Sequence, residues 1–199
     1  MEQEKMLKEL KEKVKTCNSC DLRDGCENVV FGRAIANADV IFIGEAPGEE
    51  EDEQALPFVG RSGSLLMNLI KISNLEDKSY IDNVVRCRPP DNRKPFPIEI
   101  DNCWPWLQQV LGIIQPKVIV TLGDTATSTL AAKMGFTKKI GQNKITKLAG
   151  KRIFLEDRKQ FIFPVVHPAY ALRNSIARRE LEGHIKYLGV AIDGWLHRV

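Results

Sequence analysis

The sequence predicts an α/β domain built around a parallel β-sheet. Four short apolar runs, rich in branched residues and closed by glycine or polar residues, are typical of strands that are buried on both faces. They cover residues 40–43, 80–85, 117–122 and 161–166. Segments with apolar residues at helical spacing lie between them. The length of 199 residues fits a single domain over 1–199, and a hydrophobic content of 43% is enough for its core.

The first half of the chain contains three further predicted elements. An amphipathic helix over 2–14 is followed by a turn-rich connector, 31–38, and then by the first strand. A long loop follows that strand and leads to a helix with apolar residues over 65–72. Ser62 precedes these apolar positions and is the predicted N-cap of the helix.

The second half alternates strands and helices. A helix begins at Pro97 and is expected to kink or restart at Pro105, and Asp124 is expected to cap the next helix. Residues 137–150 are polar and predict a loop, and residues 152–155 predict an edge strand. A long amphipathic helix over 175–196 ends the pattern.

Composition and charge restrict the class of protein. No apolar run approaches about 18 residues, so we expect no membrane span. The first residues have no signal-peptide pattern, which favours a cytoplasmic location. The net charge of +3 is too small to indicate nucleic-acid binding by itself. Basic residues nevertheless gather over 86–94 and at Arg173, Arg178 and Arg179, and such local patches can contact phosphates.

The loop after the first strand is the first candidate site. It lies between the carboxyl end of a strand and the amino end of a helix, where open α/β sheets bind ligands. Gly44, Gly48, Gly60 and Gly63 allow its backbone to approach a ligand closely. The glycine spacing matches neither the phosphate-binding P-loop nor the dinucleotide-binding motif.

Three polar side chains follow three of the predicted strands. Glu45 follows the first strand, Asn83 lies near the end of the second, and His167 directly follows the last parallel strand. The carboxyl ends of parallel strands meet at one edge of a sheet, so we expect these residues to converge. A buried Asn needs partners for its amide, which either the protein or an amide-like edge of a ligand can supply. For His167 the alternative is a purely structural role.

Four of the five cysteines form two pairs. Cys17 and Cys20 form a C-x2-C pair, and Cys87 and Cys103 form a wider one. Disulfides are not expected in a cytoplasmic protein. Four thiolates suit either a tetrahedral zinc ion or an iron–sulfur cluster, and unligated buried cysteines are the alternative. Cys26 is left over, and we interpret it as a free or buried thiol rather than as a ligand.

Five motifs in order, together with the cysteine pairs, resemble the family-four uracil-DNA glycosylases, which are iron–sulfur enzymes. The resemblance extends from Cys17 to about Asn174, and the set of motifs is specific although each alone is weak. The motifs are Gly-Glu-Ala-Pro-Gly at 44–48, Pro-Phe-Val-Gly at 57–60, Asn-Val-Val-Arg-Cys-Arg-Pro-Pro at 83–90, Pro-Lys-Val-Ile-Val-Thr-Leu-Gly at 116–123 and His-Pro-Ala at 167–169.

The resemblance implies a fold, a cofactor and an activity. The fold is a three-layer α/β/α sandwich around a central parallel sheet of about four strands. The cofactor is a [4Fe–4S] cluster on four cysteines. The activity is the excision of uracil from DNA, which begins base excision repair. The implied cluster ligands are Cys17, Cys20, Cys87 and Cys103.

The resemblance also implies roles for the residues of the converging loops. Uracil must leave the base stack to be reached, and Phe58 can then stack on its ring while Asn83 hydrogen-bonds its O4 and N3–H edge. Gly44 and Ala46 complete the contacts with the base. His167 is expected to stabilise the negative charge that develops at O2 of the leaving uracil.

The remaining implied roles concern water and DNA. Glu45 is expected to orient the attacking water or to stabilise the cationic sugar. Arg61 and Ser62 are expected to contact DNA, and Leu172 and Arg173 to form the loop that enters the duplex.

Two departures from related families bear on these roles. Ala46 stands where family-one enzymes have a catalytic Asp, so Glu45 must act differently. A related branch cross-links itself to DNA through a His in an insertion after the third Cys. This sequence has no His between Cys87 and Cys103, which favours turnover.

Two other functions agree less well with the sequence. One is a non-catalytic iron–sulfur DNA-binding accessory protein, which the joint presence of Glu45, Phe58, Asn83 and His167 disfavours. The other is a nucleotide or phosphate-ester hydrolase, which lacks the carboxylate cluster that two metals would need. The expected partners are uracil-containing DNA, single- or double-stranded, and a sliding clamp or a downstream abasic-site endonuclease. We expect a monomer associated with the nucleoid.

Overall fold

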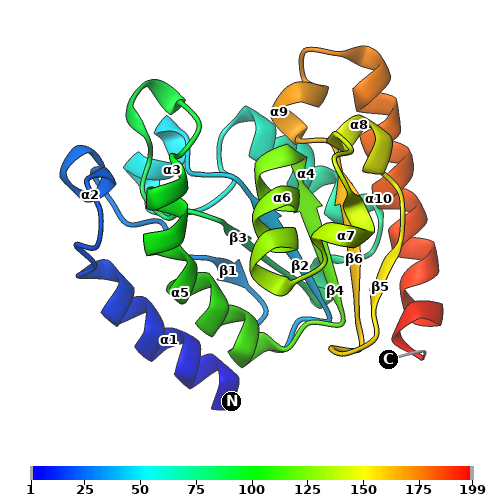
Figure 1. Cartoon of the computed structure of the whole chain (residues 1–199), viewed down its shortest axis with the longest axis horizontal. Coiled ribbons are helices and arrows are strands. Elements are labelled where there is room, and N and C mark those ends of the chain that lie inside the picture. Colours follow the sequence, from blue (N-terminus) through cyan, green and yellow to red (C-terminus); the bar gives the residue numbers. More distant parts are fainter. Residues whose placement is uncertain (1, 198–199) are drawn as a thin grey trace.

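The computed structural model describes residues 2–197 and has a six-stranded mixed sheet at its centre (Figure 1). The strand order is β1-β3-β2-β4-β6-β5. The four central strands are parallel, and β1 and β5 pair antiparallel at the two edges. The strands are β1 (Arg33–Ala34), β2 (Val40–Gly44), β3 (Ser79–Asn83), β4 (Val118–Leu122), β5 (Ile153–Leu155) and β6 (Gln160–Val165).

Helices cover both faces of the sheet, so the predicted three-layer α/β/α fold is confirmed. Successive strand residues point to opposite faces, which is why the central strands are apolar throughout. Ile41 and Ile43 pack toward α1 (Glu2–Lys15), α5 (Pro97–Ile114) and α6 (Gly123–Met134). On the other face, Val40 and Phe42 pack toward α4 (Arg61–Ile72) and α10 (Ser175–Leu196).

Several short helices and turns connect these layers. No helix within residues 2–197 is long and apolar enough to cross a membrane. The short elements are α2 (Leu22–Gly25), α3 (Glu49–Gln54), η1 (Glu76–Lys78), η2 (Pro90–Asn92), α7 (Thr137–Ile140), α8 (Ile145–Leu148) and α9 (Pro168–Ala171).

The sheet and two connections differ from the prediction. The sheet has more than four strands because the connector 31–38 contains β1, whose two residues are too few to show an alternating pattern. The predicted edge strand is present as β5. The predicted loop over 137–150 contains α7, which buries one apolar residue, and α8, which buries two. Helix α5 continues through Pro105 without a restart.

The two predicted N-caps are also wrong. Helix α4 begins at Arg61, and its N-cap is Gly60 rather than Ser62. The carboxylate of Glu51 accepts the backbone N–H of Gly60 at 2.8 Å and thus fixes the turn before the helix. Helix α6 begins at Gly123, and the carboxylate of Asp124 accepts the N–H of Ile145 at 2.8 Å, so it anchors α8 instead.

Candidate active site

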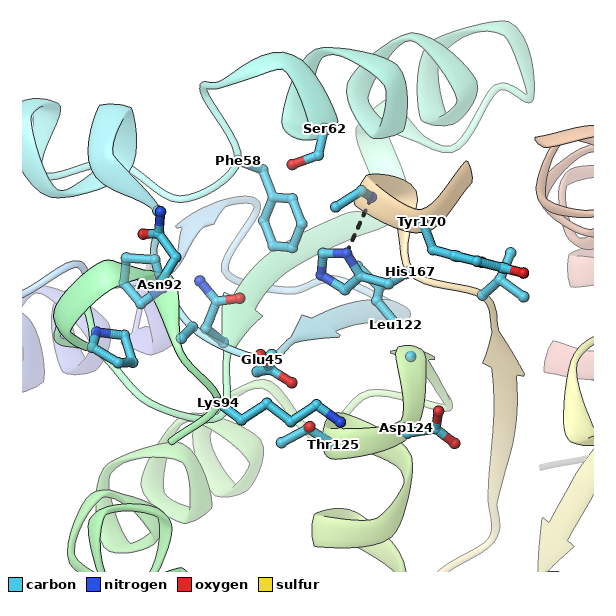
Figure 2. Close-up of a pocket in the computed structure, with 18 of the residues that line it drawn as sticks. Glu45, Phe58, Ser62, Asn92, Lys94, Leu122, Asp124, Thr125, His167 and Tyr170 are labelled. Carbon is cyan, nitrogen blue, oxygen red and sulfur yellow. Dashed lines mark hydrogen bonds between the residues drawn. The ribbon is translucent and has the colours of Figure 1, made fainter. Parts of the chain in front are cut away.

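A cavity of about 650 Å³ opens at the carboxyl edge of the parallel strands (Figure 2). Its volume is in the range of small-molecule sites. Glu45, Asn83 and His167 all line it, so the three loops converge as the strand ends predicted. Gly44 and Asn83 are register partners on neighbouring strands, which brings Glu45 close to Asn83. Phe58, Ser62 and Ala46 also line the cavity.

Gly44 leaves room for two of these side chains. A Cβ atom at this position would collide with Oδ1 of Asn83 and with the ring of Phe58. Phe58 is 6% exposed, and its ring centroid lies 6.5 Å from that of His167. The wall of the cavity is therefore tightly packed where an aromatic ring, an amide and an imidazole meet.

Asn83 carries an unsatisfied polar atom. The residue is 2% exposed, and its Oδ1 atom is buried without a hydrogen-bond partner among the described residues. An unpaired buried acceptor costs about 1–3 kcal/mol. A ligand that donates a hydrogen bond to Oδ1 would remove this cost, so the atom indicates where a ligand binds.

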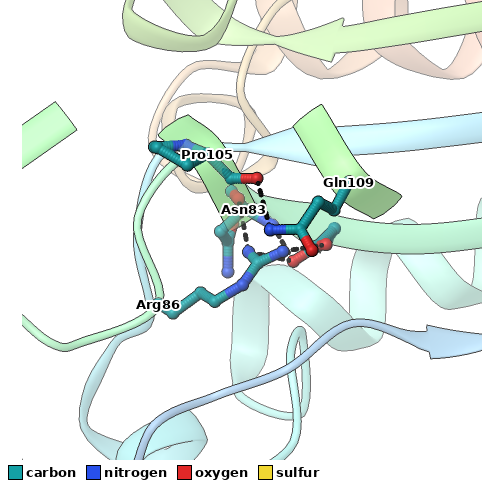
Figure 3. A network of polar contacts seen from close by, with 5 residues as sticks. Asn83, Arg86, Pro105 and Gln109 are labelled. Atoms are coloured by element: carbon teal, nitrogen blue, oxygen red, sulfur yellow. Dashed lines mark hydrogen bonds and ion pairs between the residues drawn. The ribbon is translucent and has the colours of Figure 1, made fainter. Parts of the chain in front are cut away.

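The backbone on both sides of the Asn83 Cα is fixed by a buried ion pair (Figure 3). Arg86 donates two hydrogen bonds to the carboxylate of Asp82, at 3.0 and 2.9 Å, and both side chains are 1% exposed. Asp82 accepts the backbone N–H of Asn83 at 2.8 Å, and Arg86 donates to its carbonyl at 3.3 Å. Because Arg86 is buried, it is not part of the basic DNA-facing patch predicted over 86–94.

His167 is held in one orientation by α9, of which it is the N-cap. Its Nδ1 atom accepts the backbone N–H of Ala169 at 3.2 Å (Figure 2). The neutral imidazole therefore carries its proton on Nε2, which is free to donate to a ligand. Desolvation lowers the pKa of His167 to about 4, and the negative charge of Glu51 opposes this shift. His167 is thus a neutral donor at neutral pH.

The lowered pKa of His167 predicts a pH dependence of stability. The pKa of a histidine in the unfolded chain is close to the ordinary value of 6.5, whereas that of the folded His167 is about 4. Between these two pH values, the unfolded chain therefore binds more protons at this site than the folded chain does. The free energy of unfolding should therefore fall as the pH drops through this window. NMR titration of the ring should give a midpoint near pH 4, and a midpoint near 6.5 would contradict the burial argument. The pKa of His184 is also lowered by burial, so His167→Gln should remove only part of the effect.

Glu51 is a site residue that sequence reasoning missed, because it lies within an acidic run, 49–53, whose composition is typical of solvated surface charge. Glu51 is 9% exposed and lines the cavity. Its carboxylate accepts the backbone N–H groups of Gly48, Val59 and Gly60 at 3.1, 2.9 and 2.8 Å. It therefore ties together the two ends of the loop that carries Phe58. The available signal was its position three residues after Gly48, the spacing of a capping box.

The residues predicted to bind DNA lie around the mouth of the cavity or beside it. Leu172 and Arg173 follow α9 and are exposed, and Arg173 also lines the cavity. Arg61 is exposed at the start of α4, next to Ser62. Lys94, from the predicted basic patch, also lines the cavity, and the structure adds Tyr170, which no motif indicated (Figure 2).

The four paired cysteines come together in a second, smaller cavity between the end of α1 and helix α5. All are free thiols, and Arg86 and Trp106 line the same cavity. The indole N–H of Trp106 donates to Sγ of Cys17 at 3.2 Å. Cys26 is buried and does not line this cavity, and Nη1 of Arg23 lies 3.7 Å from its Sγ. A hydrogen bond with Cys87 lowers the pKa of the Cys26 thiol to about 7. Within residues 2–197, no three His, Cys, Asp or Glu side chains are grouped to hold a single metal ion.

The fold and the cavity define an α/β protein with a ligand site at the carboxyl edge of its parallel strands, and residues 31–187 match the family model described as the uracil DNA glycosylase superfamily. The chain belongs to this superfamily and, within it, to the type-4 uracil-DNA glycosylases. The resemblance noted in the motifs is thereby confirmed.

The relatives that show this membership align over most of their length. The type-4 uracil-DNA glycosylase of Sulfurisphaera tokodaii is 43% identical over 184 residues, which are 90% of this chain and 82% of that protein. The type-4 enzyme of Thermotoga maritima is 42% identical over 174 residues, or 86% of this chain and 85% of that protein. A type-5 uracil-DNA glycosylase of Pyrobaculum aerophilum is 33% identical over 76 residues, only 38% of this chain and 33% of that protein.

Proposed function

We propose that this protein excises uracil from DNA by hydrolysing the N-glycosidic bond, which begins base excision repair. The observation that carries the proposal is the buried, unpaired Oδ1 of Asn83 in a cavity that Phe58 and His167 also line. Relatives that align over most of the chain are named type-4 uracil-DNA glycosylases, which supports the same activity. A non-catalytic DNA-binding role is not favoured, because it would leave this cavity without a ligand.

Recognition depends on one amide and one ring. The target nucleotide leaves the duplex stack at a cost of a few kcal/mol, and the released base stacks on Phe58. The Asn83 amide accepts from N3–H of uracil and donates to O4. Cytosine presents the opposite pattern, an acceptor at N3 and an amino group at C4. The site therefore distinguishes uracil from cytosine by hydrogen-bond polarity.

The chemistry separates an anionic base from a cationic sugar. As the bond between N1 and C1′ lengthens, negative charge grows on O2 of uracil, where the neutral Nε2–H of His167 donates a hydrogen bond. Glu45 orients a water molecule toward C1′ or stabilises the positive charge on the sugar. Attack by water leaves free uracil and an abasic site. The reaction transfers no electron.

The substitution Asn83→Asp tests the recognition step. An acceptor-only carboxylate would face O4 of uracil, so we expect uracil excision to fall about 10- to 100-fold. The same carboxylate can accept from the amino group of cytosine, so we expect measurable excision of cytosine. Excision under enzyme excess, from matched uracil- and cytosine-containing oligonucleotides, measures both effects.

The matched control for this substitution is Asn92→Asp. Asn92 lines the same cavity but is exposed, and its Oδ1 accepts from Nε of Arg88, which a carboxylate can also do. It should retain wild-type base selection. Unchanged uracil excision by the Asn83→Asp variant would show that Asn83 is structural, and the recognition step would then be wrong.

We also propose that Cys17, Cys20, Cys87 and Cys103 hold a [4Fe–4S] cluster. The donor set consists of thiols alone, as such clusters require, and all four line one cavity. A four-iron cluster spaces its thiolates more widely than one zinc ion does, but both suit a set of four thiols, so metal analysis must distinguish them. When bound, the cluster supplies no electron to the hydrolysis. The cysteines would cross-link the segment after α1 to the loop after β3 and to α5.

The cluster predicts a brown protein with broad absorbance near 400 nm and about four irons per chain. Cys87→Ser should bleach this absorbance. Cys26→Ser is the matched control, because Cys26 interacts with Cys87 but does not line the shared cavity, and it should keep both colour and iron. Metal analysis and visible absorption measure the result. A colourless protein with one zinc ion per chain would contradict the cluster.

The partner of this site is uracil-containing DNA. Association with the nucleoid, contacts with a sliding clamp or a downstream abasic-site endonuclease, and a monomeric state stay predictions. Sedimentation of the protein alone and with each partner would test them.

A further inference from the structure

An exposed aromatic side chain stands beside the cavity, on a loop that the proposed reaction does not use. Phe96 is 54% exposed and is the N-cap of α5. Asn92, Arg93 and Lys94, on the same loop, line the cavity. Figure 1 shows the loop before α5 at the same edge of the sheet as α9. Phe96 contacts Arg93, which lines the cavity, so its ring lies one side chain away from the cavity wall.

The ring of Phe96 is held by a buried anchor. The guanidinium carbon of Arg93 lies 3.8 Å from the ring centroid, a cation–π contact that covers one face. The same guanidinium donates to both oxygens of Glu99, at 2.6 and 2.9 Å. Glu99 is only 4% exposed, and it also accepts the backbone N–H of Phe96 at 2.6 Å. The exposed ring and the arginine behind it are thus fixed to one carboxylate.

The backbone around Phe96 has little freedom. Pro95 and Pro97 flank it, and each fixes its own φ angle. Pro95 is buried, so the loop is attached to the body of the protein directly before the ring. An aromatic side chain that is already ordered loses little entropy when it binds a ligand. This arrangement suits a binding surface that is formed in advance.

We propose that Phe96, supported by Arg93, is a stacking platform for an unpaired nucleobase of the uracil-containing strand, next to the flipped nucleotide. This rests on the proposed function, because the ligand is the strand that carries uracil. Aromatic rings stack on any base, so the platform tolerates every sequence. Lys94 lies two residues away and adds a positive charge for a backbone phosphate. A base within a duplex stays stacked on its neighbours, so the platform favours single-stranded DNA.

The test uses the full chain and a single-stranded oligonucleotide with a tetrahydrofuran abasic analogue in place of the uracil nucleotide. The fluorescent base 2-aminopurine is placed at successive positions on both sides. We expect wild-type protein to quench its fluorescence at one position close to the analogue. Phe96→Ala should abolish this quenching and weaken single-strand binding roughly 5- to 100-fold. Phe96→Tyr should retain both, and duplex binding should change little.

Ile98→Ala is the matched control, because Ile98 is 63% exposed on the first turn of the same helix. It should leave quenching and affinity unchanged. Wild-type quenching and affinity in Phe96→Ala would overturn the proposal that Phe96 is a stacking platform. An equal loss of quenching and affinity in Ile98→Ala would also overturn it. Uracil excision is measured in parallel at saturating protein. Retained excision with lost quenching in Phe96→Ala supports the platform, whereas a wild-type protein that excises no uracil would overturn the proposed function itself.

Discussion

Replacing His167 with alanine should lower the single-turnover rate of uracil excision by about 10²- to 10³-fold, while the affinity for DNA changes little. The hydrogen bond from Nε2 to O2 strengthens as charge develops on the leaving base, so its contribution lies mainly in the transition state. The ring is already oriented by the N–H of Ala169, and burial keeps it neutral. The rate is measured with enzyme in excess, and binding is measured on a duplex with an abasic analogue.

Two variants separate an effect on the chemical step from the general loss of a buried histidine and from weaker DNA binding. His184→Ala removes a second histidine whose pKa is also lowered by burial but which does not line the cavity, and it should excise uracil at the wild-type rate. Arg173→Ala should mainly weaken DNA binding and reduce the salt dependence of the affinity, because contacts between basic side chains and DNA phosphates cause that dependence. If His167→Ala lost only affinity and kept its saturated rate, His167 would be a packing residue and the chemistry would depend on Glu45 alone.

Removing one member of the buried pair between Asp82 and Arg86 should have the largest effect on stability. Arg86→Met leaves a buried carboxylate without its partner, and we expect the free energy of unfolding to fall by about 3–5 kcal/mol. Replacing both residues, as in Asp82→Leu with Arg86→Met, removes the uncompensated charge and should recover most of this loss. Denaturant unfolding of the two single variants and the double variant measures the coupling.

The double variant also tests what the pair does for the site. It folds without the two groups that bind the backbone N–H and carbonyl of Asn83, so uracil excision should stay low although stability returns. The control is Asp193→Asn, which breaks an exposed pair with Lys78 and should change stability little. A double variant as unstable as Arg86→Met, or one with full activity, would contradict this account of the pair.

The sequence predicted the sheet and the converging site well because both depend on local patterns. Parallel strands buried on both faces give continuous apolar runs, and the residue after each run must lie at the carboxyl edge. Glu45, Asn83 and His167 could be placed together by this rule alone. Strand β1 could not be predicted, because two residues show no periodicity and its pairing with β3 is set by the tertiary fold.

Prediction from the sequence failed mainly for charged residues that the fold buries, because their burial is decided by tertiary contacts. Within the run 49–53, Glu51 and Asp52 are buried while Glu49 and Glu50 are exposed, and nothing in the composition of the run distinguishes them. Asp52 accepts the backbone N–H groups of residues 27 and 28, which are distant in sequence. Arg86 was interpreted as part of a basic patch for the same reason.

The most direct test of the central claim uses two oligonucleotides that differ only by uracil or thymine at one position. Each is incubated with purified protein, and abasic sites are then cleaved with alkali. The account predicts a cleaved fragment from the uracil substrate alone, and a strongly reduced yield in the His167→Ala variant under the same conditions. Binding of the uracil substrate by wild-type protein without any alkali-sensitive product would contradict the account, and the protein would then be a non-catalytic DNA-binding module.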